Sequence, residues 1–192
     1  MIPACFLDRD GTIISQEEYP ILRPEQLKLL PGAGRAIRSL NDAGWPVIVV
    51  SNQAIVARGL IDEAGLDALH AHLRDMLRLD CGGRIDAIYY CPHHPNPSEP
   101  TRVERYCLEC ECRKPKPGLL LRAACDLGID LARSILIGDS TGDAAAARAA
   151  GARSILLTEA GHAGQDGVAA CAPDWRASDL LSAAALALRH LS

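Results

Sequence analysis

Short apolar runs alternate along the chain with longer stretches in which apolar residues recur every three or four positions. The short runs have the length of buried strands, and the periodic stretches are typical of amphipathic helices. The expected strands cover residues 4–7, 47–50, 85–90, 134–137 and 154–157. The expected helices cover residues 33–43, 62–77, 117–127, 143–150 and 178–190. This alternation predicts an α/β fold, with a Rossmann-like parallel sheet and helices on both faces.

Residues 91–118 interrupt the alternation, because they are rich in Cys, His and Pro and carry almost no periodic apolar pattern. We expect a loop here, inserted into one domain that spans residues 1–192. A chain of 192 residues is long enough to bury a sizeable core as a single domain.

Composition narrows the classes of partner. The hydrophobic content of 48% is ordinary for a globular protein, and the net charge of −4 disfavours a nucleic-acid backbone as partner. The N-terminal residues lack the pattern of a signal peptide, and no apolar run reaches the length of a membrane span. We therefore expect a cytoplasmic protein that binds neither nucleic acid nor membrane, and we take a monomer as the default state.

Polar side chains follow three of the expected strands. Asp8 and Asp10 come after the first strand, Ser51 and Asn52 end the second, and Asp139 follows the fourth. Any one of these is an ordinary strand-to-loop transition when taken alone. Ligands of parallel sheets bind beyond the carboxyl ends of the strands, so three such ends together indicate a site.

The first of these segments carries candidate chemistry. Side chains two apart on an extended chain point the same way, so Asp8 and Asp10 start on one side. With no basic partner expected nearby, the two carboxylates favour a cation, and oxygen ligands with phosphate suit Mg²⁺. One carboxylate can attack phosphorus while the other moves a proton. Arg113 and Lys114 offer positive charge for a phosphate, and the alternative for them is a solvated surface pair.

The Cys-rich loop predicts a second metal site. Three thiols and one imidazole form a closed tetrahedral zinc set, supplied by Cys91, His93, Cys110 and Cys112. Cys107 and His94 are nearby alternatives, since Cys107 and Cys110 are also a plausible ligand pair. In a chain without a secretory signal, metal ligands and buried thiols are favoured over disulfides.

Taken together, these motifs resemble the haloacid dehalogenase (HAD) superfamily of phosphohydrolases. The matching segments, in the order of the superfamily, are Asp8-Arg9-Asp10-Gly11-Thr12, Ser51-Asn52-Gln53, Lys114-Pro115 and Gly138-Asp139 with Asp143. The resemblance implies that Asp8 is the nucleophile and forms an aspartyl-phosphate. It implies that Asp10 is first the general acid and then the general base.

The resemblance also implies the ligands. Mg²⁺ would be held by Asp8, Asp139 and the backbone carbonyl of Asp10, with Asp143 as support. Structural zinc would be held by the Cys-x-His and Cys-x-Cys pairs. The implied phosphoryl-binding and substrate-binding residues are Ser51, Asn52, Gln53, Arg113, Lys114 and Ser140.

Within the superfamily, the chain is similar to a small, capless branch. That branch includes phosphatases of D-glycero-D-manno-heptose 1,7-bisphosphate and of histidinol phosphate. The expected reaction is therefore removal of the 7-phosphate of the heptose, with histidinol phosphate or another small sugar phosphate as alternative substrate. Ser51 stands where many relatives have Thr, and Ser140 where some have Lys, which removes one expected basic contact to substrate.

Two other classes of protein share part of this pattern. A receiver domain also carries a phospho-accepting Asp on a parallel sheet, but it has no use for Asp10 as an acid or for a zinc loop. A zinc ribbon that binds nucleic acid would need a basic patch with interleaved aromatic residues, and the chain has none. Elsewhere, His70 and His72 lie on the expected helix 62–77 and are expected to be surface residues.

Overall fold

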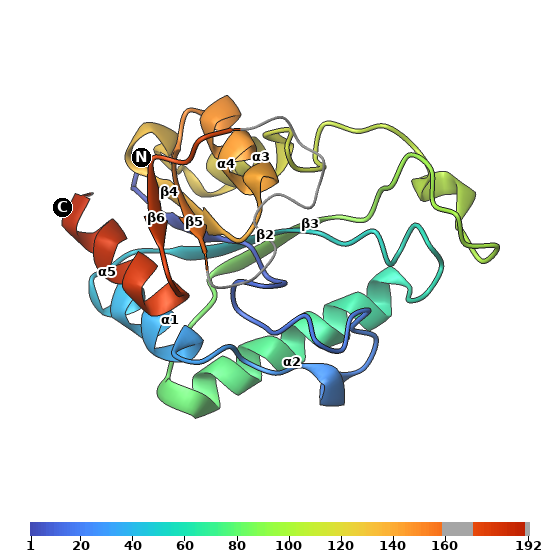
Figure 1. Cartoon of the computed structure of the whole chain (residues 1–192), viewed down its shortest axis with the longest axis horizontal. Coiled ribbons are helices and arrows are strands. Elements are labelled where there is room, and N and C mark those ends of the chain that lie inside the picture. The colour runs from blue at the N-terminus through green and yellow to red at the C-terminus, as the bar shows by residue number, and fades with distance from the viewer. Residues whose placement is uncertain (159–170, 191–192) are drawn as a thin grey trace.

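A computed structural model of the chain describes residues 1–158 and 171–190. Across these residues, six parallel strands form one sheet in the order β3-β2-β1-β4-β5-β6 (Figure 1). The strands are β1 (Cys5–Leu7), β2 (Val47–Asn52), β3 (Ala87–Cys91), β4 (Ile135–Gly138), β5 (Arg153–Leu157) and β6 (Trp175–Ala177). The helices are α1 (Ala33–Asp42), α2 (Glu63–Cys81), α3 (Gly118–Leu127), α4 (Thr141–Ala150) and α5 (Leu180–His190).

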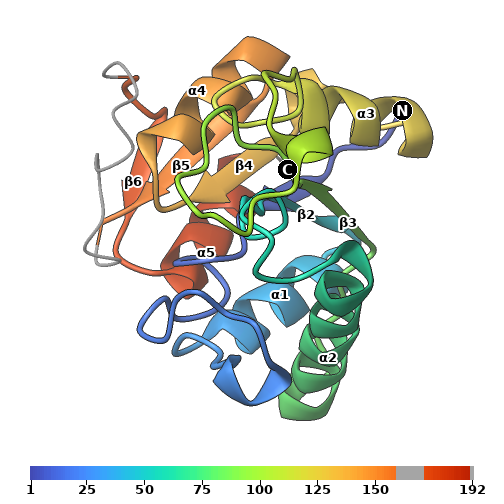
Figure 2. The same ribbon diagram turned by 90° about the vertical axis from the view of Figure 1, so that its right-hand side faces the viewer.

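The helices cover both faces of the sheet, as the alternating pattern predicts. Figures 1 and 2 show α1, α2 and α5 on one face and α3 and α4 on the other. Successive side chains of β1 point to opposite faces of the sheet. Cys5 and Leu7 pack in the core with α1, α2 and α5, and Phe6 packs in the core with α3 and α4. Both cores are fully buried at β1, which explains why this strand reads as a continuous apolar run.

The strand order places a topological switch point at the centre of the sheet. β1 pairs with β2 on one side and with β4 on the other, so the chain leaves β1 in one direction and returns on its other side at β4. In open α/β sheets such a point opens a crevice beyond the carboxyl ends of the strands. The residues that follow β1 and β4 therefore meet there.

One strand is absent from the sequence-based expectation. β6 spans only Trp175–Ala177 and lies at the edge of the sheet, where its three residues remain partly or fully exposed. Such a short edge strand produces neither a buried apolar run nor a long alternation. The other five strands and the five helices of the described residues lie where the pattern predicts them, with shifts of at most four residues at their ends.

The long connection between β3 and α3 folds over the carboxyl edge of the sheet (Figure 2). It is tied to the loop after β2 by two backbone hydrogen bonds, Val103 N to Ala57 O at 2.8 Å and Ala57 N to Pro92 O at 3.2 Å. The Thr101 hydroxyl adds a bond of 2.7 Å to the Arg58 carbonyl. Within the described residues, no helix is both long enough and apolar enough to cross a membrane.

Candidate active site

Asp8 lies at the switch point, directly beyond β1. Its backbone N–H bonds to the Ile137 carbonyl of β4 at 2.9 Å, which fixes where the side chain starts. The Lys114 ammonium lies 2.8 Å from Asp8 Oδ1 and 2.6 Å from Asp143 Oδ1, and it also donates to the Val50 carbonyl at 2.8 Å. Lys114 is therefore a buried cation that joins β1, β2 and α4.

A cluster of three carboxylates surrounds this position. One oxygen from each of Asp8, Asp139 and Asp143 lies within 4.8 Å of the others, and all three side chains are largely buried. Burial is the main cause of a raised pKa at Asp8, to about 6, and at Asp139, to about 8. The neighbouring carboxylates contribute to this rise, and the Lys114 ammonium opposes it. Burial alone would lower the pKa of Lys114, but Asp143 and Asp8 raise it above its ordinary value. One ammonium beside three carboxylates leaves an excess of negative charge, so this donor set fits a hard divalent cation.

Two glycines make room for the cluster. Gly11 has φ of +78°, and a Cβ built there would collide with the Asp139 carboxylate. A Cβ on Gly138 would collide with the carboxylate of Asp143. Both positions therefore need the absence of a side chain, and Gly11 also needs the left-handed conformation that glycine tolerates.

Asp10 is held by a different cation. The expectation that the two carboxylates lack a basic partner was wrong, because Arg9 turns inward and Lys114 arrives from the long connection. Arg9 Nη2 donates to both oxygens of Asp10 at 2.8 and 2.9 Å, and Arg9 Nε adds a bond of 3.1 Å. Gln53 Nε2 donates to Asp10 Oδ2 and to Ser51 Oγ, each at 2.8 Å. Gln53 thus connects the carboxylate after β1 with the hydroxyl in β2.

The remaining candidate residues stabilise the loops that carry the charges. Asn52 brackets the backbone of Lys114, donating to its carbonyl and accepting from its N–H, both at 3.0 Å. Ser140 caps the N-terminus of α4, and its hydroxyl donates to Asp143 Oδ2 at 2.6 Å. The half-buried Arg113 donates to the His93 carbonyl at 3.3 Å.

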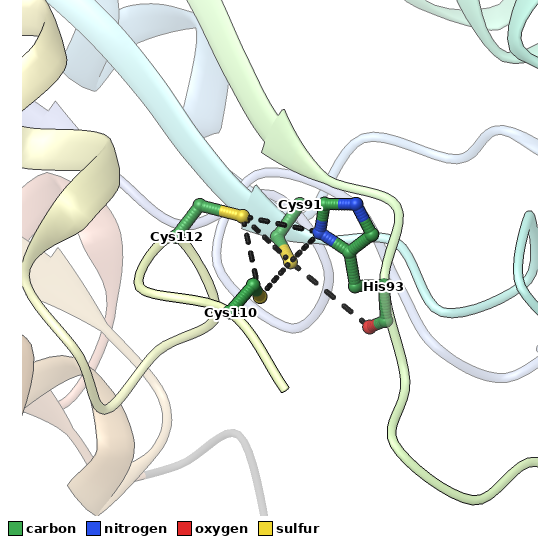
Figure 3. Close-up of side chains that lie close together, drawn as sticks. All are labelled: Cys91, His93, Cys110 and Cys112. Atoms are coloured by element: carbon green, nitrogen blue, oxygen red, sulfur yellow. Dashed lines mark hydrogen bonds between the residues drawn. The ribbon is translucent and has the colours of Figure 1, made fainter. Parts of the chain in front are cut away.

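A second group lies where the long connection begins and returns. Figure 3 shows Cys91, His93, Cys110 and Cys112 with their ligand atoms facing one another, and these atoms lie within 4.8 Å. The three sulfurs are 3.2 to 3.5 Å apart, and His93 Nδ1 lies 3.4 Å from Cys112 Sγ. Ligands of a tetrahedral zinc at Zn–S of about 2.3 Å are about 3.8 Å apart, so a modest expansion accommodates the ion.

The electrostatics of this group also suit a metal. The hydrogen bond between the two sulfurs lowers the pKa of Cys112 to about 5 and raises that of Cys91, so one thiol of the group readily forms the thiolate that binds metals. The two alternative ligands have other partners: Cys107 Sγ donates to the Val103 carbonyl at 3.3 Å, and His94 Nδ1 accepts from Asn96 N at 3.2 Å.

Comparison with known proteins adds the family. A family model described as HAD-hydrolase-like matches residues 111–183. A Rhodopseudomonas palustris protein named D-glycero-beta-D-manno-heptose-1,7-bisphosphate 7-phosphatase is 44% identical over 149 residues, covering 78% of this chain and 79% of its own. A Thermosynechococcus vestitus protein named D-glycero-D-manno-heptose-1,7-bisphosphate 7-phosphatase is 40% identical, covering 99% and 97%. The chain belongs to the HAD phosphatases. The resemblance inferred from the motifs is thereby confirmed.

A solved HAD phosphatase shares the architecture. The crystal structure of D,D-heptose 1,7-bisphosphate phosphatase from B. bronchiseptica, complexed with magnesium and phosphate, is 32% identical to this chain. It superposes with a TM-score of 0.79 and covers 98% of this chain and 99% of its own. This chain therefore shares the fold of a solved HAD phosphatase over nearly its whole length.

Two polar residues of this HAD phosphatase were not predicted to contribute to the site. The sequence indicates Arg9 only as part of a motif, yet its side chain is buried between Asp10 and Gln53. His70 was expected at the surface, but it is 3% exposed, and its Nε2 lies 3.3 Å from Arg9 Nη1. His70 continues the apolar face of α2 made by Leu66, Leu69 and Leu73, and that spacing is the signal that could have indicated its burial.

Proposed function

We propose that this HAD phosphatase is a Mg²⁺-dependent phosphomonoesterase that removes the 7-phosphate of D-glycero-D-manno-heptose 1,7-bisphosphate. The observation that carries the reaction type is the arrangement around Asp8: one buried ammonium at 2.8 Å and two further carboxylates at the switch point of the sheet. The names of the relatives support this substrate, because the alignments with these relatives cover most of both chains. The substrate partner is thus a small phosphorylated sugar.

The reaction follows from the separate placement of the two motif carboxylates. An oxygen of Asp8 attacks phosphorus and displaces the sugar oxygen, and Asp10 supplies the proton that this oxygen needs. The product is a neutral sugar hydroxyl and an aspartyl-phosphate on Asp8. Asp10 then takes a proton from water, whose oxygen attacks the same phosphorus and releases inorganic phosphate and free Asp8. Both proton transfers balance, so Asp10 returns to its starting state.

The residues that would hold Mg²⁺ are Asp8, Asp139 and the backbone carbonyl of Asp10, with Asp143 as support. The clustered carboxylates, and the raised pKa values of Asp8 and Asp139, are the observations that fit this ion. When bound, Mg²⁺ would neutralise charge on the phosphoryl oxygens. Lys114 supplies the second positive charge, and it already contacts Asp8 and Asp143.

In this proposal, the Ser51 hydroxyl and the Lys114 ammonium bind the phosphoryl group, and Arg113 binds the rest of the substrate. Asn52, Gln53 and Ser140 support these groups through the hydrogen bonds described above. Fixed donors around the transferred group stabilise the transition state because they need no reorganisation during the reaction.

We further propose that residues 1–192 form one capless domain that works as a monomer and carries structural zinc. Among the described residues, the longest connection between strands and helices is the one from β3 to α3. The Cys and His group lies in residues 91–112, which run from the last residue of β3 into this connection. Four protein ligands close a zinc site, so this ion would hold the connection over the sheet edge rather than take part in the chemistry.

The substrate is tested by comparing kcat/KM for heptose 1,7-bisphosphate with kcat/KM for histidinol phosphate at saturating Mg²⁺. We expect the heptose to be preferred, with release of the 7-phosphate identified by NMR. The Asp8→Asn protein, purified in the same way, is the control for contaminating phosphatases. Equal or higher kcat/KM for histidinol phosphate would overturn the substrate and leave the reaction type standing.

A further inference from the structure

Arg9 is the largest of the fully buried side chains, with 1% of its surface exposed, and it lies beside the active-site carboxylates. Burying a guanidinium is unfavourable unless its donors are paired. Each of its three guanidinium nitrogens has a partner. Nε and Nη2 donate to Asp10, Nη2 also donates to Gln53 Oε1 at 2.9 Å, and Nη1 lies 3.3 Å from His70 Nε2. The rigid planar fork of Arg turns these contacts into a fixed orientation.

His70 supplies the contact at the far end of the guanidinium. It lies on α2, is 3% exposed, and packs its ring against Tyr90 with 5.5 Å between ring centroids. Burial, followed by the charge of Arg9, lowers the pKa of His70 to about 3, so the imidazole is neutral. A neutral Nε2 can accept from Arg9, whereas a second cation there would repel it.

The far side of Asp10 is held as well. Gln53 Nε2 donates to Asp10 Oδ2, and the bidentate Arg9 pair fixes the plane of the same carboxylate. The Asp10 side chain nevertheless keeps 15% of its surface exposed. It is thus oriented by buried neighbours without being sealed off from a substrate.

We propose that Arg9 and His70 are positioning residues that orient the Asp10 carboxylate for proton transfer to the leaving oxygen, with His70 setting the plane of Arg9 from α2. The inference rests on the proposed function, in which Asp10 protonates the departing group. Removing the acceptor at His70 frees one end of the guanidinium, so Asp10 loses its fixed orientation while Asp8 and Lys114 keep theirs. Misplacement of a catalytic group by about 1 Å can cost about 100-fold in rate.

The leaving group provides a readout that a merely structural role would not move. An alkyl phosphate releases a strongly basic oxygen that needs the proton from Asp10, whereas p-nitrophenyl phosphate releases a stable phenolate that hardly needs it. The parameter to compare is kcat/KM, because it reports the steps up to departure of the leaving group and excludes hydrolysis of the phospho-enzyme. For the His70→Leu protein we expect kcat/KM on heptose 1,7-bisphosphate to fall about tenfold or more, since general acids contribute about 10² to 10⁴. On p-nitrophenyl phosphate it should stay close to wild type.

Matched variants separate the hydrogen bond from bulk and fold. His70→Gln keeps an acceptor that can reach Arg9, so it should retain most of the activity on both esters. His72→Leu makes the same change at an exposed position of α2 and should leave both values unchanged. Arg9→Lys keeps the charge but loses the bidentate hydrogen bonds to Asp10, so it should show the same selective loss of kcat/KM. This variant provides the test if His70→Leu does not fold. Circular dichroism and thermal unfolding verify that each protein is folded.

An equal fall of kcat/KM on both esters in a folded His70→Leu or Arg9→Lys protein would show a structural role and overturn the inference. Unchanged kcat/KM values on both esters would also overturn the inference, because they would show that Asp10 does not depend on these residues. A wild-type protein that hydrolyses neither ester with Mg²⁺ would instead overturn the proposed function itself, and the inference with it.

Discussion

Asp8 and Asp10 are two residues apart, yet each is held by its own cation. Lys114 contacts Asp8 from the long connection, and Arg9 grips Asp10 from within the motif. Asp8 also shares its surroundings with Asp139, whereas Asp10 bonds to Gln53. At the scale of single residues, these separate surroundings support the proposed roles of Asp8 in attack and of Asp10 in proton transfer.

These surroundings predict different failures for Asp8→Asn and Asp10→Asn. The Asp8 variant should form no phospho-enzyme, because it lacks the attacking oxygen. The Asp10 variant should still form one, and turnover should fall about 10² to 10⁴-fold, the usual contribution of a general acid or base. Acid-quenched reactions analysed by intact-protein mass spectrometry measure both outcomes. A phospho-enzyme trapped in the Asp8→Asn protein would show that another residue is the nucleophile.

The sequence was sufficient to indicate Asp8 and Asp10, because they directly follow an expected strand, and Lys114, because it lies in a motif of the superfamily. The burial of Arg9 could not be predicted in the same way. An arginine between two aspartates fits an exposed turn equally well, and alternation in a strand would place it opposite both. The chain turns tightly here, with the Arg9 carbonyl accepting from the N–H groups of Ile13 at 2.9 Å and Ile14 at 3.1 Å. Long-range pairing with Gln53 and His70 then determines where the side chain lies.

At the scale of elements, the connection from β3 to α3 links the Cys and His group to the active site. Cys112 is separated from Lys114 by a single residue, and the Cys91 sulfur lies 3.2 Å from that of Cys112. The position of the Lys114 ammonium therefore depends on how the returning segment is anchored. The sequence predicted these four side chains as zinc ligands, and the structure groups them while leaving Cys107 and His94 outside the group.

This dependence predicts that Cys110→Ala loses zinc and lowers kcat. The connection lacks an apolar face of its own, so without metal little offsets its chain entropy, and Lys114 loses its fixed position. Zinc content by elemental analysis and steady-state rates at saturating Mg²⁺ measure the two effects. Cys107→Ala is the matched control, since that thiol lies outside the ligand group and should leave both unchanged. A zinc-free Cys110→Ala protein with wild-type kcat would show that Lys114 is anchored by other contacts.

At the scale of the whole molecule, the acidic cluster couples folding to metal and to pH. Asp8 and Asp139 follow the two central strands, and Asp143 lies in α4, so the repulsion between them acts where the sheet and a helix layer meet. The raised pKa values of Asp8 and Asp139 mean that the folded metal-free protein holds protons that the unfolded chain has released. Stability of the metal-free protein should therefore decrease as the pH rises from about 4, the ordinary pKa of Asp, to about 8, the pKa of Asp139.

Mg²⁺ should reverse this loss, and the reversal should grow with pH. The ion binds the ionised carboxylates of the folded state, so protons compete with it at pH 5 and hardly at pH 8. At a Mg²⁺ concentration about 100 times Kd, linkage adds about 2.7 kcal/mol of stability. For a chain of this size that corresponds to a rise in Tm of about 5 to 10 °C. Thermal unfolding with Mg²⁺ and with chelator, at pH 5 and pH 8, measures the difference. Asp139→Asn should lose most of the shift at pH 8, and Asp75→Asn, at an exposed position of α2, should keep it. If Mg²⁺ does not change the Tm at pH 8, the three carboxylates do not form the metal site.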